Sequence, residues 1–157
     1  MRIIVFSDTH GRTKGMTGVL ENMIGVDAVI HCGDGASDIK RMSENFQDID
    51  FYYVNGNCDG ESSNREKMIE LGGKKFFVTH GDYYKVKSES EIEYPTLREE
   101  GRRRGADAVL FGHTHVAYNR NWGDIMVINP GCVERYGTYS IIEIENGIMK
   151  SMNHRIF

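Results

Sequence analysis

Cysteine is scarce in this chain, with three residues among 157. Cys32, Cys58 and Cys132 are odd in number and widely spaced, which excludes the dense disulfide framework of small secreted domains. Unpaired thiols suit a reducing compartment better than an oxidising one. We therefore expect a cytoplasmic protein in which Cys32 and Cys132 fill space in the core.

Long apolar runs and an excess of positive charge are also lacking. No run approaches the roughly 20 apolar residues that span a bilayer, and the apolar start of the chain stops at Ser7-Asp8, too early for the core of a signal peptide. The 19 Lys and Arg against 23 Asp and Glu give a net charge of −4, whereas proteins that coat nucleic acids are normally basic. We expect no membrane partner, and the charge gives no strong nucleic-acid signal.

The composition that is present, 39% hydrophobic and 27% charged, is ordinary for a globular domain. A chain of 157 residues is long enough to bury a hydrophobic core without stabilising cross-links. The sequence shows no linker, internal repeat or low-complexity stretch. We expect a single domain over residues 1–157. The sequence leaves both a monomer and a homo-oligomer open.

The order of strand-like and helix-like patterns indicates an α/β fold. Strands are predicted at 2–7, 27–32, 50–54, 67–71, 74–79 and 107–111, and helices at 13–24, 36–46 and 90–104. The early βαβαβ order predicts a mainly parallel sheet with right-handed crossovers. Gly72-Gly73 marks a hairpin turn. From Val116 onward the pattern indicates antiparallel strands, with Asn146-Gly147 as the tightest turn. We predict two packed sheets with helices outside.

Five short segments carry metal-binding side chains, and each follows a predicted strand. They are Ser7-Asp8-Thr9-His10, Gly33-Asp34, Gly56-Asn57-Cys58-Asp59, Thr79-His80-Gly81 and Gly112-His113-Thr114-His115. Sites in open α/β sheets form beyond the carboxyl ends of the strands. Two Asp, one Asn and four His are too many for one tetrahedral zinc and suit two divalent ions that share a carboxylate. Since such an ion pair, about 3.5–4 Å apart, promotes displacement at phosphorus, the pattern indicates a dinuclear phosphoesterase.

The five segments, in this order, resemble the motifs of the calcineurin-like metallophosphoesterase superfamily. The form Gly-Asn-Cys-Asp is similar to the small single-domain, YfcE-like phosphodiesterase branch, and the likeness covers nearly the whole chain, including Asn129-Pro130-Gly131. The resemblance implies an α/β fold built as a four-layer α/β/β/α sandwich, with two mixed sheets flanked by helices. It also implies a bridging hydroxide that attacks phosphorus.

The resemblance further implies a role for each ligand. Asp34 would bridge two divalent ions, of which Mn²⁺ is favoured, although Fe²⁺, Ni²⁺ and Zn²⁺ also suit a shell of nitrogen and oxygen. The first ion would be held by Asp8, His10 and His115, and the second by Asn57, His80 and His113. Catalytic roles are expected for Asn57, Cys58, Asp59 and His113.

One position departs from the wider superfamily, in which the residue after the metal-binding Asn is usually His. Here it is Cys58. A thiol with a reference pKa of ~8.5 is a poor proton donor. We therefore expect a preference for diesters and for substrates with good leaving groups.

Plainer interpretations exist for single residues. Asp34 could cap the helix that starts near Ala36, and Asp8 could cap the helix that follows Asp8, predicted at 13–24. His31 is expected in the core or behind the ligands. The joint occurrence of all seven candidate ligands favours metal binding.

The leading prediction is a metal-dependent phosphodiesterase acting on a small or nucleotide-like phosphodiester. The alternatives are a phosphomonoesterase or nuclease on the same site, a non-catalytic protein-interaction scaffold of the same fold such as the retromer subunit, and a nucleotide sensor without turnover. The acidic balance disfavours a nuclease, and the complete ligand set disfavours a scaffold.

Overall fold

The computed structural model describes residues 1–88 and 93–156. Its first sheet has the order β10-β9-β1-β2-β3 and its second the order β4-β5-β6-β8-β7. The first sheet contains β1 (Arg2–Phe6), β2 (Ala28–His31), β3 (Asp50–Tyr53), β9 (Thr138–Glu145) and β10 (Ile148–Arg155). The second contains β4 (Glu66–Leu71), β5 (Lys74–Thr79), β6 (Ala108–Leu110), β7 (Tyr118–Asn121) and β8 (Met126–Asn129). The helical segments are α1 (Lys14–Asn22), α2 (Ala36–Asn45), the short turn η1 (Asp82–Tyr84), α3 (Pro95–Arg103) and α4 (Val133–Tyr136).

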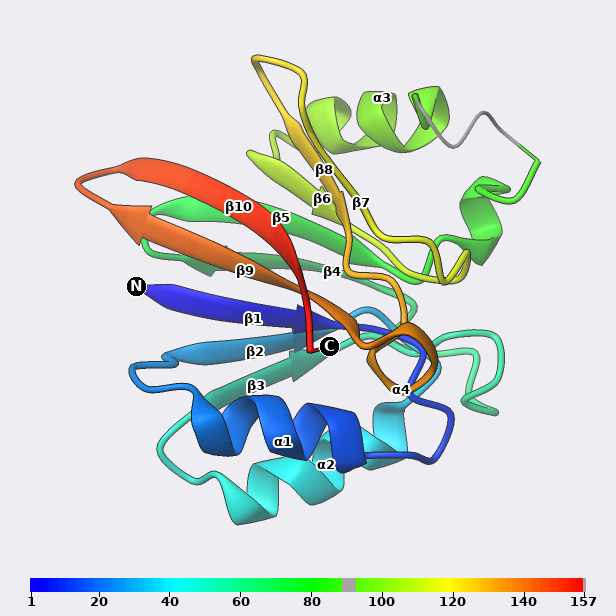
Figure 1. Cartoon of the computed structure of the whole chain (residues 1–157). Coiled ribbons are helices and arrows are strands. Elements are labelled where there is room, and N and C mark those ends of the chain that lie inside the picture. Colours follow the sequence, from blue (N-terminus) through cyan, green and yellow to red (C-terminus); the bar gives the residue numbers. More distant parts are fainter. Residues whose placement is uncertain (89–92, 157) are drawn as a thin grey trace.

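The sheets pack against each other, with α1 and α2 outside the first sheet and α3 outside the second (Figure 1). This arrangement confirms the four-layer α/β/β/α sandwich of two mixed sheets. Within the described residues, none of the helices has the length and hydropathy of a bilayer-spanning segment.

The strand β1 shows why its apolar run is continuous. Ile3 and Val5 belong to the cluster between the two sheets, whereas Ile4 and Phe6 pack toward α1 and α2. Alternate side chains of a strand point to opposite faces, so a strand buried on both faces must be apolar at every position. Each fully buried side chain of this kind contributes about 1.5–3 kcal/mol.

The predicted parallel βαβαβ unit is confirmed, since β1 pairs parallel with β2 and β2 with β3. The predicted hairpin at Gly72-Gly73 joins β4 and β5, and Asn146-Gly147 joins β9 and β10. The antiparallel strands predicted after Val116 are confirmed, β7 with β8 and β9 with β10, and β8 also pairs parallel with β6, which the sequence did not indicate. The short helix α4 was not predicted. The predicted helix over 90–104 begins only at Pro95, and its residues 90–92 lie outside the described part.

The carboxyl ends of five strands meet along one edge of the sandwich. The segments after β1, β2 and β3 belong to the first sheet, and those after β5 and β6 to the second. Backbone hydrogen bonds tie the segments together, from Asp8 N to Gly33 O at 3.0 Å and from Gly112 N to His80 O at 3.1 Å. All five candidate ligand segments therefore converge.

Candidate metal centre

A buried carboxylate oxygen of Asp8 lies at the centre of the converging segments. Asp8 Oδ1 is 3.2 Å from His115 Nε2, 3.9 Å from His10 Nε2 and 4.0 Å from His80 Nε2. Within the described part of the chain this oxygen accepts no hydrogen bond. A buried anionic oxygen without a hydrogen-bond donor is costly. Together with the imidazole nitrogens around it, this oxygen forms a set of ligand atoms for a cation. The residues therefore fit a divalent metal ion.

A second group of donors surrounds His80. Its Nε2 atom is 3.4 Å from Asp34 Oδ2, 3.1 Å from Asn57 Oδ1 and 3.1 Å from His113 Nδ1. Asp34 Oδ2 also lies 3.8 Å from His10 Nε2, so this carboxylate reaches toward both groups. The structure thus brings together all seven ligands that the sequence predicts.

Each aspartate is held by one oxygen and presents the other. Asp8 Oδ2 accepts a hydrogen bond from His113 N at 3.0 Å, and Asp34 Oδ1 accepts one from Cys58 N at 2.8 Å. His80 Nδ1 donates to Cys32 O at 2.8 Å, which leaves the Nε2 lone pair facing the site. Such outer contacts orient metal ligands. The free oxygens and the free imidazole nitrogen all point inward.

The backbone of the site is left-handed at five of the seven ligands. The φ angles are 59° for Asp8, 49° for His10, 57° for Asp34, 67° for His113 and 60° for His115. These account for five of the nine positive φ values at residues other than glycine in the described chain. Residues other than glycine rarely adopt this backbone conformation, and a cluster of such residues is typical of functional sites.

Two glycines allow the close approach of the ligand loops. A Cβ atom at Gly56 would lie 2.1 Å from Asp34 Oδ1, and one at Gly112 would lie 1.9 Å from Ser7 Oγ and 2.7 Å from Asp8 Oδ2. Any larger residue would displace the carboxylates. These glycines are therefore part of how the site is built.

Burial and the neighbouring opposite charges shift the pKa values of the site residues in opposite directions. Burial raises the pKa of Asp8, but His115 and His80 outweigh it and hold that pKa below its ordinary value. The same balance, with His80 as the main partner, places the pKa of Asp34 well below its ordinary range. Burial lowers the pKa of His80, but the carboxylates outweigh it and raise that pKa. The carboxylates are thus held in their charged form, which is the form that binds a cation.

The calcineurin-like phosphoesterase superfamily domain matches residues 1–147. The chain belongs to this superfamily. A phosphodiesterase of Methanocaldococcus jannaschii is 33% identical over 151 residues, which cover 83% of each chain. A solved structure from Streptococcus pneumoniae, described as a predicted phosphoesterase, has a TM-score of 0.70 at 26% identity and covers 98% of this chain and 97% of that one. Vps29 of Entamoeba histolytica in complex with Zn²⁺ has a TM-score of 0.72 at 17% identity, covers 99% of each chain, and shows likeness of fold alone.

In this superfamily member Asp59 positions the ligand loops. Its Oδ2 atom accepts hydrogen bonds from Asp34 N at 2.8 Å and Gly56 N at 2.7 Å, and its Oδ1 atom accepts one from Ala36 N at 2.9 Å. Both oxygens are thereby engaged with backbone amides, so Asp59 is better described as a positioning residue than as the catalytic residue that the sequence predicts. Asp59 also provides the carboxylate at the start of α2, the capping role that the sequence suggested for Asp34.

Glu134, and not Asp8, provides the carboxylate at the start of α1. Its Oε1 atom accepts hydrogen bonds from Gly15 N at 2.8 Å and Met16 N at 3.3 Å. The two helix-capping interpretations are therefore wrong, and both candidate metal aspartates remain free for the site.

Cys58 lies exposed beside the ligands. One donor atom each of Cys58, His10 and Asp34 lie within 4.8 Å of one another, and Asn57 Nδ2 donates a hydrogen bond to Cys58 Sγ at 3.3 Å. Partial desolvation of the sulfur, together with the hydrogen bond to Asp34, raises the pKa of the thiol. The thiol is therefore an even weaker acid than its type suggests.

A buried network behind the ligands was only partly foreseen. His31 was expected in the core or behind the site, and it lies fully buried with its Nδ1 accepting from Gly33 N at 3.2 Å. Its Nε2–H then donates to Thr9 Oγ1 at 3.2 Å, and Thr9 donates to Asp38 Oδ2 at 2.6 Å. Thr9 and Asp38 were not recognised in the sequence, because neither residue type is distinctive on a loop or in a helix.

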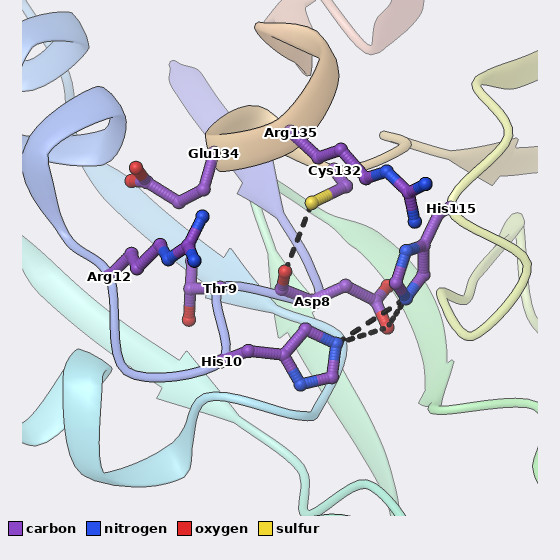
Figure 2. A pocket seen from close by; sticks show the side chains of 8 residues that line it. All are labelled: Asp8, Thr9, His10, Arg12, His115, Cys132, Glu134 and Arg135. Atoms are coloured by element: carbon purple, nitrogen blue, oxygen red, sulfur yellow. Dashed lines mark hydrogen bonds and ion pairs between the residues drawn. The ribbon is translucent and has the colours of Figure 1, made fainter.

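A pocket of about 380 Å³ opens beside the Asp8 group (Figure 2). Asp8, His10 and His115 line it together with Arg12 and Arg135. Neither arginine was predicted from the sequence as a site residue. The only local signal was that Arg12 follows the first ligand motif and Arg135 follows the Asn129-Pro130-Gly131 run.

Proposed function

We propose that this chain is a phosphodiesterase with a dinuclear divalent-metal site. Asp8, His10 and His115 hold the first ion, Asn57, His80 and His113 hold the second, and Asp34 is shared. The observation that carries the proposal is the pair of buried aspartates, each fixed through one oxygen and presenting the other to imidazole nitrogens. The relative named a phosphodiesterase, at 33% identity, supports the reaction class.

Two bound divalent ions, with Mn²⁺ favoured, would withdraw charge from a phosphoryl group and lower the pKa of a water between them. The chain supplies the orientation. Asp8 and Asp34 are buried and rigidly held, whereas His10, Asn57 and Cys58 are exposed. A substrate therefore approaches from the side of these exposed residues, and the phosphoryl group meets Asn57 and His113 at the edge of the second group.

The weak acidity of Cys58 favours diesters. Its thiol pKa is raised by partial desolvation and by Asp34, so the position offers little help in protonating a leaving oxygen. A phosphodiester with an acidic leaving group needs no such help. The expected substrate is a small or nucleotide-like diester.

The test begins with protein stripped of metal and reloaded with Mn²⁺, Fe²⁺, Ni²⁺ or Zn²⁺. Turnover is measured on bis(p-nitrophenyl) phosphate, on p-nitrophenyl phosphate and on cyclic nucleotides. Metal-dependent turnover of the diester, lost in His113→Ala and kept in His154→Ala, supports the proposal. His154 is a suitable control because its imidazole stacks on Tyr139, 5.6 Å between ring centroids, and not on the ligand groups.

The competing function is a protein-interaction scaffold. The likeness of fold to Vps29 supports this alternative. Because that structure contains Zn²⁺, bound metal alone does not distinguish a phosphodiesterase from a scaffold. Metal binding without turnover of any diester, monoester or cyclic nucleotide would favour the scaffold.

A further inference from the structure

We propose that Arg12 and Arg135 bind a second phosphoryl group of the substrate, next to the one that is cleaved. The preferred substrate would then be a phosphodiester that carries an additional phosphate. This inference rests on the proposed function and specifies its substrate class.

The two arginines belong to the pocket beside the first group of ligands. Figure 2 shows them on either side of Asp8, Arg12 from the loop after β1 and Arg135 from α4. His10 and His115 line the same pocket. An anion between the two guanidinium groups would therefore lie close to a phosphoryl group held at the metal site.

Neither arginine is neutralised by the protein. Among the described residues, six other arginines form ion pairs with carboxylates, namely Arg2, Arg41, Arg65, Arg102, Arg103 and Arg104. No such ion pair involves Arg12 or Arg135 within the same part of the chain. Of the two acids that line the pocket, Glu134 accepts hydrogen bonds from the first amides of α1, and Asp8 belongs to the candidate metal site. The pocket thus holds two arginines without an ion-pair partner among the described residues, alongside the carboxylates of Asp8 and Glu134.

The backbones that carry the arginines are fixed to the ligand loops. Arg12 N donates to Thr9 O at 3.0 Å, within the loop that contains Asp8. Cys132, just before α4, donates from Sγ to Asp8 O at 3.1 Å and from its backbone N to Thr138 Oγ1 at 3.1 Å. The backbone at both arginines is thus tied to the segment that carries Asp8, and their exposed side chains extend from it.

The chemistry of the pair selects a phosphoryl group. A guanidinium group donates in a planar fork that matches phosphate oxygens. A phosphate monoester carries about −1.5 to −2 charges at neutral pH and three acceptor oxygens, which two guanidinium groups can bind together. The pocket of about 380 Å³ has room for such a group beyond the one at the metals.

The test compares two chromogenic diesters, thymidine 5′-(p-nitrophenyl phosphate) and its 3′-phosphorylated form. They share the cleaved group and the leaving group and differ in one phosphoryl group. For the Mn²⁺-loaded protein we expect kcat/KM to be roughly tenfold higher on the 3′-phosphorylated ester, the scale of one net charge-assisted contact. Arg12→Met and Arg135→Met should each bring this ratio toward one. Arg120→Met is the matched control, since Arg120 lies on β7 over the Trp122 ring, and it should keep the ratio.

A wild-type ratio near one would overturn the inference. So would a ratio that survives both substitutions, including the case in which rates fall equally on both esters, because the arginines would then serve the cleaved group. If the protein cleaves neither ester, the proposed function fails and binding decides the inference separately. Calorimetry should then show that thymidine 3′,5′-bisphosphate binds more tightly than thymidine 5′-monophosphate, with the difference lost in Arg135→Met. Equal affinity of the wild type for both nucleotides refutes the second phosphoryl site.

Discussion

His31 should make the metal-free protein sensitive to mild acid. Burial lowers the pKa of this fully buried imidazole to about 4, against a partly opposing effect of Asp8, Asp59 and Asp38. In the unfolded chain the pKa returns to about 6.5. Between these two values the unfolded state binds a proton that the folded state does not, so the free energy of unfolding falls as the pH drops.

The size of the effect follows from the two pKa values. Lowering the pH from 7.5 to 5 should cost about 2 kcal/mol of stability through His31 alone, and full titration about 3 kcal/mol. His31→Gln keeps an N–H donor toward Thr9 Oγ1 and cannot titrate. The variant should therefore lose about 2 kcal/mol less than the wild type over this interval.

Urea unfolding of metal-free protein at pH 7.5 and pH 5 provides the measurement. The other titrating groups are common to both proteins and cancel in the difference, provided that the substitution does not disturb them. His154→Gln serves as the control and should retain the wild-type loss. Equal losses in the wild type and in His31→Gln would refute the reasoning. If His31→Gln does not fold, NMR titration of the His31 ring in the wild type decides, because the ring must stay neutral well below pH 6.

Three further predictions address the metals and the reaction. Elemental analysis of loaded protein should find two divalent ions per chain, fewer in Asp34→Ala; one ion or fewer in the wild type, with no change in the variant, would contradict a shared carboxylate. Rates on aryl diesters should rise steeply with leaving-group acidity and exceed those on alkyl monophosphates, and Cys58→His should improve turnover of poor leaving groups; comparable rates on both classes would contradict the role given to the thiol. Asp8→Asn and His113→Ala should each lower kcat at least ~10²-fold while circular dichroism of the metal-free proteins stays native; wild-type turnover in both would show that the ligands are not catalytic.

Local patterns in the sequence were sufficient to predict most strands. The apolar run of β1 predicted a strand buried on both faces, and β5 has the predicted bounds, Lys74–Thr79. The parallel direction of β8 depends on which strand it meets in the second sheet, a tertiary relation that no local pattern carries. The helix α4, Val133–Tyr136, is too short to display a helical period.

The candidate ligands could be found because metal chemistry restricts residue types. Their conformations could not, since nothing in the sequence indicates that Asp8 or His113 adopts a left-handed backbone. Residues that act through position were also missed or misassigned. Asp59 resembles a catalytic acid in its motif, yet its oxygens bind backbone amides of two other segments. Such roles arise only from contacts between distant parts of the chain.

The fold and the site depend on different residues, the apolar strands of the core and the loops at the sheet edge. The fold alone therefore does not decide the function. The two sheets are specified by apolar strands such as β1, and Vps29 reaches a TM-score of 0.72 with only 17% identity. The site, by contrast, depends on a few side chains in the loops beyond those strands, which can change without altering the core. In this chain the loops fix one oxygen of Asp8 and one of Asp34 through backbone amides. A buried carboxylate oxygen that lacks a hydrogen-bond donor is costly unless a cation binds it. That unsatisfied oxygen of Asp8 is therefore the strongest physical argument that the site binds a metal ion, and turnover is the property that separates the two functions, phosphodiesterase and scaffold.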